Sequence, residues 1–255
     1  MYISSKSFSE ACDLVICPWY VENPSIPPKT PRRIFITGEY GIFNRFLHLL
    51  QSFDEPYELV YHRTDRTFDR QGFEAIRNYV SHIYAENCEI KHEKITQLPL
   101  GFPDDRLPTR LSIDKDILCY LNVGLPNDQE LKFVQYRSIR QQCIEHFKNK
   151  SWCTLEDNIP IDSFNERMNR SKFVVCPMGF GIDTHRFYEA AWLGCTPIVI
   201  TSGLDDLYKK FGALIVDSWD EVTEELLSRH VKVEVPDSLF KVEDYMSYGI
   251  NPLTC

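Results

Sequence analysis

Short apolar runs recur along the chain, and most of them are separated by stretches in which apolar residues return every three or four positions. The runs predict β-strands at 13–17, 33–37, 58–61, 82–85, 95–99, 118–123, 152–155, 173–176, 197–200 and 213–216. The stretches between them predict helices at 43–50, 72–80, 131–148, 161–169, 184–193, 203–210 and 219–229. Strands that alternate with helices imply right-handed crossovers and parallel sheets covered on both faces. The pattern therefore predicts an α/β protein.

The length of the chain predicts two domains, because 255 residues exceed the usual size of one. The stretch 103–116 is polar, contains proline and has little periodicity, so we expect the linker there. This places an N-terminal domain at 1–110 and a C-terminal domain at 111–235. The tail, 236–255, carries several aromatic residues, and we expect it to pack back on the domains.

Composition and charge describe a globular protein and exclude two kinds of partner. Hydrophobic residues make up 43% of the chain and aromatic residues 13%, which is typical of a folded domain. The formal net charge is -9, and no concentrated basic patch is present. We therefore expect no binding to nucleic acid or to an anionic membrane surface.

The cysteines and the start of the chain indicate a reducing compartment. The nine cysteines are an odd number and form no Cys-x-x-Cys pair, which argues against a disulfide framework and against a zinc site. The first residues lack the basic start and apolar core of a signal peptide, and no run of 18 apolar residues occurs. We expect a soluble, cytoplasmic protein without a membrane anchor.

The stretch 173–200 has the pattern of a strand, a glycine-containing loop, a helix and a second strand. In a parallel sheet the loop lies at the carboxyl end of the first strand, where open α/β sheets bind ligands. Thr184 is a plausible N-cap, so the positive end of the helix dipole would face the loop and favour an anion. Arg186 and Glu189 are three residues apart and share a helix face, so one can hold phosphate while the other accepts hydrogen bonds from sugar hydroxyls.

The string SKFVVCPMGFGIDTHRFYEAAWLGCTPIVI closely resembles the C-terminal half of exostosin-like glycosyltransferases. Members of this family carry a Ser-Lys-Phe strand, a Pro-x-Gly loop, a Gly-x-Asp-x-x-Arg helix start, a Glu three residues later and Gly-Cys-x-Pro after the helix. The specific match covers roughly 118–227, and only the stretch KITQLPLGF matches loosely before it. The resemblance, which is to compact bacterial and large-virus members, implies a GT-B-like fold: two Rossmann-like domains, the N-terminal one shortened, with a cleft between them.

The resemblance also assigns donor-binding roles. It implies that Glu189 binds the ribose hydroxyls and that Arg186 binds the diphosphate, whereas the alternatives are a Glu that only complements the helix dipole and an ion pair between these two residues. His185 could contact phosphate or the transferred sugar, or be structural. Asp183 either faces sugar hydroxyls or accepts hydrogen bonds within the loop, and Thr184 begins the helix.

Two glycines and two arginines complete the predicted donor site. Gly179 and Gly181 allow a tight loop and a close approach of the backbone to a phosphate. The family usually carries Arg after the proline of this loop, where this chain has Met178, so another cation would be needed. Family members carry an Arg on the first helix of the C-terminal half, and both Arg140 and Arg137 are candidates for it, with a solvated helix face as the alternative for each.

A glycosyltransferase needs a base that removes a proton from the acceptor hydroxyl. The polar loop after the strand at 58–61 offers Asp65 first, with His62 and Glu39 as further candidates. The alternative for Asp65 is that it caps a turn or pairs with Arg63 or Arg66.

The resemblance implies an inverting reaction that uses a UDP-sugar and a hydroxyl of a glycan or glycoprotein acceptor. Retaining enzymes often carry a second Glu eight positions before the ribose-binding one, and this chain has Gly181 there. The one Asp-x-Asp sequence, Asp114-Lys115-Asp116, lies in the predicted linker and does not follow a predicted strand, so we expect no metal cofactor. Xylose is slightly favoured among the candidate sugars. The alternative is a non-catalytic subunit that binds a nucleotide sugar within a glycan-building complex.

Overall fold

The structure is a computed structural model and describes residues 1–22, 24–125 and 131–246. The chain forms two compact units: unit 1 combines Met1–Asp105 with the segment that begins at Asp237, and unit 2 is Arg106–Pro236. The boundary between the units therefore lies between Asp105 and Arg106, and the described part of the tail belongs to unit 1.

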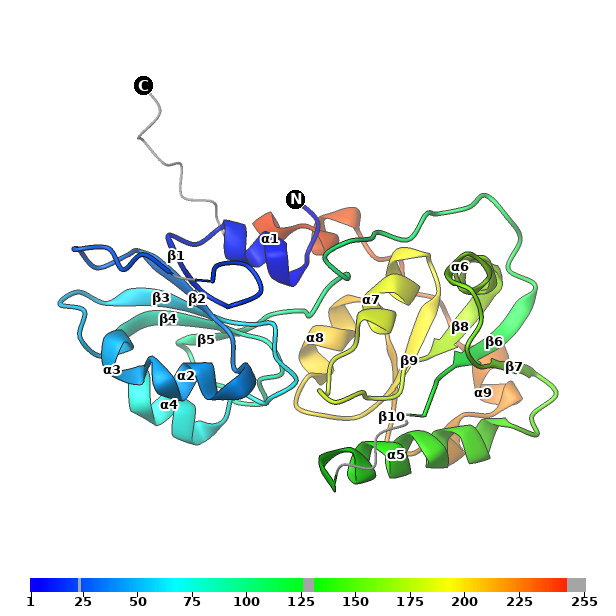
Figure 1. The fold of residues 1–255 in the computed structure, drawn as a ribbon. Coiled ribbons are helices and arrows are strands. Elements are labelled where there is room, and N and C mark those ends of the chain that lie inside the picture. Colours follow the sequence, from blue (N-terminus) through cyan, green and yellow to red (C-terminus); the bar gives the residue numbers. More distant parts are fainter. Residues whose placement is uncertain (23, 126–130, 247–255) are drawn as a thin grey trace. The chain divides into compact units, whose positions relative to one another are not determined.

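Unit 1 is built on a parallel sheet with its strands in chain order (Figure 1). The strands are β1 (Leu14–Ile16), β2 (Arg33–Ile36), β3 (Tyr57–Tyr61), β4 (Val80–Ala85) and β5 (Ile95–Gln97). The helical segments after β2 and β3 are η1 (Glu39–Gly41), α2 (Ile42–Arg45), α3 (Leu47–Leu50) and α4 (Arg70–Ile76). Every connection steps in the same direction along the sheet, so right-handed crossovers place α2, α3 and α4 on one face, where they cover an apolar core.

The opposite face of this sheet is covered by the first helix of the chain and by two short helical segments between residues 237 and 244. These are α1 (Ser5–Glu10), which Ser4 caps by accepting a hydrogen bond from the Ser7 amide, together with η3 (Asp237–Phe240) and η4 (Val242–Asp244). The amide of Ile3 donates to the carbonyl of Phe240 at 3.0 Å, and the Phe102 and Phe240 rings stack at 5.9 Å. The helix α1 was not predicted, because its sequence SKSFSE has no apolar period.

Unit 2 has a second parallel sheet in the order β10-β9-β8-β6-β7 (Figure 1). Its strands are β6 (Ile117–Asn122), β7 (Cys153–Glu156), β8 (Ser171–Val175), β9 (Thr196–Ile200) and β10 (Leu214–Val216). Its helices are α5 (Leu131–Phe147), α6 (Ile161–Arg170), α7 (His185–Trp192), α8 (Asp205–Lys210), η2 (Trp219–Glu221) and α9 (Glu224–Arg229).

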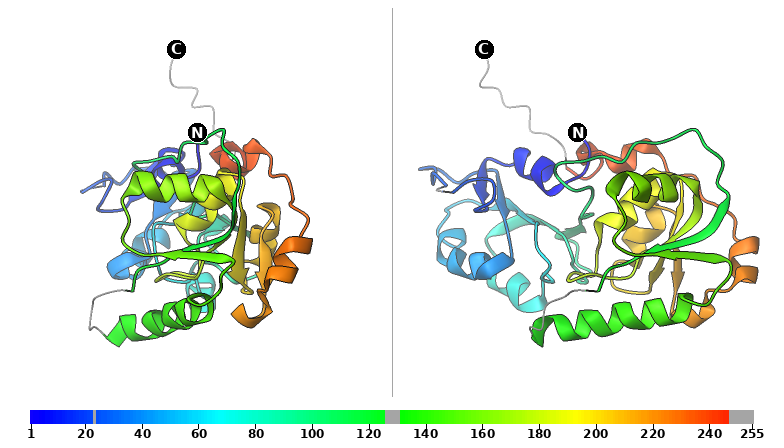
Figure 2. Two further views of the ribbon diagram at one scale, coloured as in Figure 1. Left: turned by 90° about the vertical axis from the view of Figure 1, so that its right-hand side faces the viewer. Right: turned by 45° about the vertical axis from the view of Figure 1, so that its right-hand side comes forward.

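The direction of the connections in unit 2 reverses between β6 and β8. The crossover after β6 runs to β7 on one side, whereas the crossover after β8 runs to β9 on the other. Helices α5 and α9 consequently cover one face of the sheet, and α6, α7 and α8 cover the other (Figure 2). Such a reversal is the switch point at which open α/β sheets bind ligands, next to the carboxyl ends of the strands.

Two parallel-sheet, Rossmann-like domains confirm the predicted α/β class and are consistent with a GT-B-like fold. Some boundaries differ from the prediction. The helix predicted at 43–50 is divided at Phe46 into α2 and α3, and the helix predicted at 219–229 is divided into η2 and α9. The eight cysteines within the described residues are unbonded. In the described ranges, no helix combines the length and the apolar character that a membrane crossing requires.

Candidate functional site

Two arginine side chains from different helices meet at the switch point of unit 2. Arg140 of α5 donates from Nη1 to the carbonyl of Gly124 at 3.0 Å and from Nε to the carbonyl of Met178 at 3.3 Å. Arg140 thus joins the segments that follow β6 and β8. Arg186, in the first turn of α7, donates from Nη1 to the carbonyl of Asn122, the last residue of β6. A guanidinium group therefore lies beside Met178, where the family pattern has an arginine of its own.

Both arginines are half-buried, and the negative charge of Glu189 only partly offsets the effect of burial on the pKa of Arg186. Burial lowers the pKa of Arg186, and burial together with the positive charge of Arg186 lowers the pKa of Arg140. No carboxylate among the described residues forms an ion pair with either group, and Nε of Arg186 is buried without a hydrogen-bond partner there. Two desolvated cations and an unsatisfied donor favour an anion at this point.

The glycine loop approaches Arg140 closely. A Cβ atom at Gly179 would lie 3.2 Å from Nη2 of Arg140, so a side chain there would push against the guanidinium group. The amide of Gly179 donates to the carbonyl of Gly181 at 3.1 Å, which closes the loop. Thr184 occupies the N-cap position of α7 with an extended backbone, as predicted, but its side chain makes no capping hydrogen bond.

Asp183 connects this loop to helices α7 and α8 through hydrogen bonds. Its buried carboxylate accepts hydrogen bonds from the Thr184 amide at 2.9 Å, from the Tyr188 hydroxyl and from the Tyr208 hydroxyl at 3.2 Å. Burial and the charge of Asp183 raise the pKa of Tyr208 well above its usual value, so the phenol remains a donor. These contacts fit the role of an acceptor within the loop.

Glu189 is 2% exposed and does not pair with Arg186. Its Oε1 atom accepts instead from Nε and Nη2 of Arg106, at 3.2 and 2.9 Å. The i, i+3 ion pair with Arg186, which the sequence allowed, is therefore wrong. Arg106, the first residue of unit 2, was not singled out in the sequence, because it lies 83 positions before its partner.

The two remaining donor-site candidates are less enclosed. His185 is half-buried at the start of α7. Arg137 is exposed on α5, one turn before Arg140. Of the two arginine candidates on this helix, Arg140 reaches the glycine loop.

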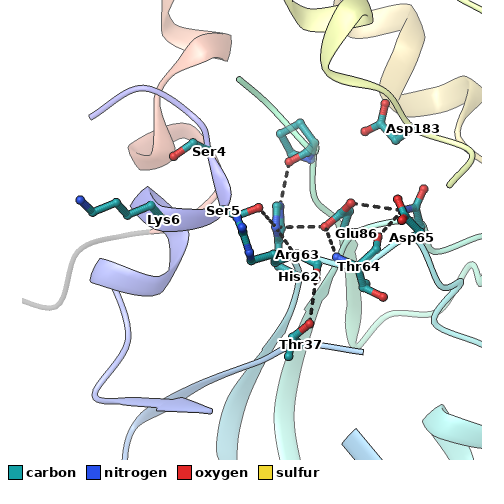
Figure 3. A network of polar contacts seen from close by, with 12 residues as sticks. Ser4, Ser5, Lys6, Thr37, His62, Arg63, Thr64, Asp65, Glu86 and Asp183 are labelled. Atoms are coloured by element: carbon teal, nitrogen blue, oxygen red, sulfur yellow. Dashed lines mark hydrogen bonds and ion pairs between the residues drawn. The ribbon is translucent and has the colours of Figure 1, made fainter. Parts of the chain in front are cut away.

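In unit 1 the loop that carries Asp65 is held almost entirely by side chains. It follows β3, and the supporting side chains come from the carboxyl ends of β2, β3 and β4 (Figure 3). The contacts are Arg63 N to His62 Nδ1 (2.8 Å), Thr37 Oγ1 to Arg63 O (2.7 Å), Thr64 N to Glu86 Oε2 (3.4 Å), Asn87 Nδ2 to Thr64 O (2.8 Å), Asp65 N to Glu39 Oε1 (2.8 Å) and Arg66 N to Thr64 Oγ1 (2.9 Å). A loop whose polar backbone groups are satisfied in this way is fixed in position, as a functional loop requires.

His62 lies beneath this loop with no exposed surface. Its Nε2 atom faces the carbonyl of Pro99 at 3.1 Å, so this nitrogen carries a proton. Ser5 Oγ and Glu86 Oε2 both lie next to Nδ1, at 3.1 and 3.0 Å. Because both contact the same ring nitrogen, the imidazole cannot pass a proton between them from one nitrogen to the other. The ring supports the loop backbone and reaches no solvent, so it offers no direct contact to a substrate in this arrangement.

Asp65 is exposed at the outer end of the loop. Partial burial and the nearby charge of Glu39 raise the pKa of Asp65. The alternative pairing with Arg63 is not formed, because Arg63 pairs with Asp104 at 2.7 Å. Glu86 was not predicted as a site residue, although its position directly after β4 could have indicated that it lies at the carboxyl edge of the sheet.

The part of the chain that the structure describes contains no group of three or more His, Cys, Asp or Glu residues arranged to hold a metal ion.

Comparison with known proteins relates both units to glycosyltransferases. The sequence-family model described as the RXYLT1 C-terminal domain matches residues 120–233. A protein named probable glucuronosyltransferase from Oryza sativa subsp. japonica is 26% identical over 228 aligned positions, and the match covers 83% of this chain and 52% of the relative. The probable beta-1,4-xylosyltransferase IRX10 from Arabidopsis thaliana is 31% identical over 86 residues, which are 34% of this chain and 19% of the relative. The chain thus spans about half the length of the first relative and less of the second.

Proposed function

We propose that this protein is an inverting, metal-independent glycosyltransferase that moves a sugar from a UDP-sugar to a hydroxyl group of a glycan acceptor. The similarity to proteins named as glucuronosyl- and xylosyltransferases supports the class of reaction. The observation that carries the proposal is the pair Arg140 and Arg186 at the switch point, two desolvated cations with no carboxylate partner among the described residues.

In this proposal unit 2 binds the donor. Arg186 and Arg140 bind the diphosphate, because a guanidinium group matches phosphate oxygens and strengthens its hydrogen bonds when desolvated. Glu189 binds the ribose hydroxyls through Oε2, while Arg106 holds Oε1. The charge that develops on the leaving diphosphate is stabilised by the two arginines and by the amide groups at the start of α7.

Unit 1 supplies the base and binds the acceptor. Asp65 takes the proton from the acceptor hydroxyl as its oxygen forms a bond to the anomeric carbon. The bond between that carbon and the diphosphate oxygen breaks in the same displacement, and UDP leaves, so the configuration inverts. The raised pKa of Asp65 suits this role, since a base is most effective when its pKa approaches the working pH.

The sugar is selected by the donor pocket, and xylose and glucuronic acid are the first candidates because relatives carry these names. Calorimetry with UDP, UMP and uridine tests the donor site first. We expect UDP to bind at least about 100-fold more tightly than uridine, because two charge-assisted contacts add roughly 1.5–3 kcal/mol each and about 1.4 kcal/mol corresponds to a factor of ten.

Release of UDP from a panel of UDP-sugars, in the presence of glycan acceptors and of EDTA, tests transfer. Turnover that persists in EDTA supports the metal-independent reaction. Binding of UDP without release from any donor would instead favour a non-catalytic nucleotide-sugar-binding subunit, and equal binding of UDP and uridine would refute the donor site.

A further inference from the structure

Unit 1 contains a pocket of about 220 Å³ that the reaction outlined above does not use. It opens between α2, α4 and the loop that follows β3. The rings of Phe43, Tyr61 and Phe68 form its base, with ring centres 5.0–6.1 Å apart. Exposed polar side chains line its rim, among them Asn44, Arg66 and Gln71.

The loop that carries the candidate base forms part of the pocket wall, through Arg66 and Thr67, which directly follow Asp65 in the chain. The hydroxyl oxygens of Tyr61 and Thr64 both lie against Gly38, 1.8 and 2.8 Å from the position of an added Cβ atom. Thr64 in turn donates to Glu39 at 3.0 Å, and Glu39 accepts from the amide of Asp65. A ligand in the pocket would therefore lie next to the loop that carries Asp65.

The chemistry of the lining favours a neutral sugar over a phosphate. The Asp69 carboxylate lies in the wall and accepts the Gly72 amide at 2.8 Å, so a negative charge already caps α4. Burial raises the pKa of Tyr61 to about 12, so its hydroxyl is a proton donor at neutral pH. Aromatic rings below and amide, hydroxyl and guanidinium groups at the rim match the apolar face and the hydroxyls of a pyranose.

The size of the pocket limits the occupant. Sites for drug-sized ligands measure roughly 300–1,000 Å³, so a pocket below that range suits one sugar ring and not an oligosaccharide. We propose that this pocket binds a single pyranose ring of the glycan acceptor and presents one of its hydroxyls to Asp65. This inference rests on the proposed function, whose donor site lies in unit 2.

Saturation-transfer NMR with methyl β-pyranosides of xylose, glucose, galactose and glucuronic acid tests the pocket directly, with UDP present. Ala75 lines the pocket and is half-buried, so Ala75→Phe fills it. The rim variants Asn44→Ala and Gln71→Ala change exposed side chains and do not threaten the fold. Arg70→Ala is the matched control, because Arg70 is exposed beside Gln71 but does not line the pocket.

We expect at least one glycoside to give a signal that Ala75→Phe abolishes and that each rim variant weakens about three- to tenfold, as the loss of one hydrogen bond predicts. The Arg70→Ala control should match the parent protein. If Ala75→Phe does not fold, the two rim variants decide the question. A signal unchanged in the rim variants, or no signal from any glycoside, overturns the pocket assignment. Calorimetry of UDP with the same variants should be unchanged, so the failure of this inference is distinguishable from the failure of the donor site.

Discussion

Replacing Arg186 with methionine should separate ligand binding from stability. Methionine keeps most of the apolar volume of the side chain but removes the charge. In the binding reaction the variant loses a charge-assisted contact to phosphate worth roughly 1.5–3 kcal/mol. Because about 1.4 kcal/mol corresponds to a factor of ten, the Kd for UDP should rise about 10- to 150-fold.

The effect of Arg186→Met on folding should be small. The variant loses the hydrogen bond to the Asn122 carbonyl, worth roughly 1.5–3 kcal/mol because the donor is charged. It also removes a desolvated charge whose Nε has no partner among the described residues, which is a gain of opposite sign. We therefore expect the free energy of unfolding in urea to stay within about 1 kcal/mol of the parent protein, or to rise, since these two effects oppose each other.

The assay is calorimetry with UDP and with uridine, and the control is Arg137→Met. Arg137 is also an arginine, but its side chain is exposed on α5. The loss should be specific to the diphosphate, so uridine binding should change little in either variant. A folded Arg186→Met protein that binds UDP as tightly as Arg137→Met would refute the assignment of the anion site.

Three further outcomes are expected. If Asp65 is the base, kcat/KM should fall as the pH drops through a pKa above the usual value for Asp. Glu39→Gln removes the neighbouring negative charge that raises this pKa, so the fall should move to lower pH. An identical pH profile in Glu39→Gln would contradict the assignment. Arg106→Ala leaves the buried Glu189 without its partner, so thermal unfolding should occur a few degrees lower and the KM for the donor should rise, whereas a change in kcat alone would argue against a positioning role. Gly38→Ala should destabilise unit 1 by about 1–3 kcal/mol in urea unfolding, because its Cβ atom would overlap a tyrosine hydroxyl; an unchanged midpoint would show that the ring moves aside freely.

Local pattern was sufficient for the strands and helices that alternate along the chain, and it also placed the glycine loop and Arg186 at a strand's carboxyl end. The helix α1 escaped prediction, because its serine-rich sequence becomes a helix through its Ser4 cap and the burial of Phe8. Likewise, His62 follows a strand in a polar stretch and was a candidate base, but Ser5 and Pro99 contact its ring nitrogens and the ring has no exposed surface.

The amino-acid sequence by itself determined the strands and helices that have a clear apolar period, because periodicity and helix or strand geometry are properties of neighbouring residues. It also determined that Arg186 and Glu189 share one face of a helix. Whether two charged side chains on one helix face pair with each other depends on the groups that other segments place beside them. Here Glu189 pairs with Arg106, and Arg186 lies at the switch point beside Arg140. Such partnerships are set by distances across strands and loops far apart in the chain, and for that reason they became visible only in the folded structure.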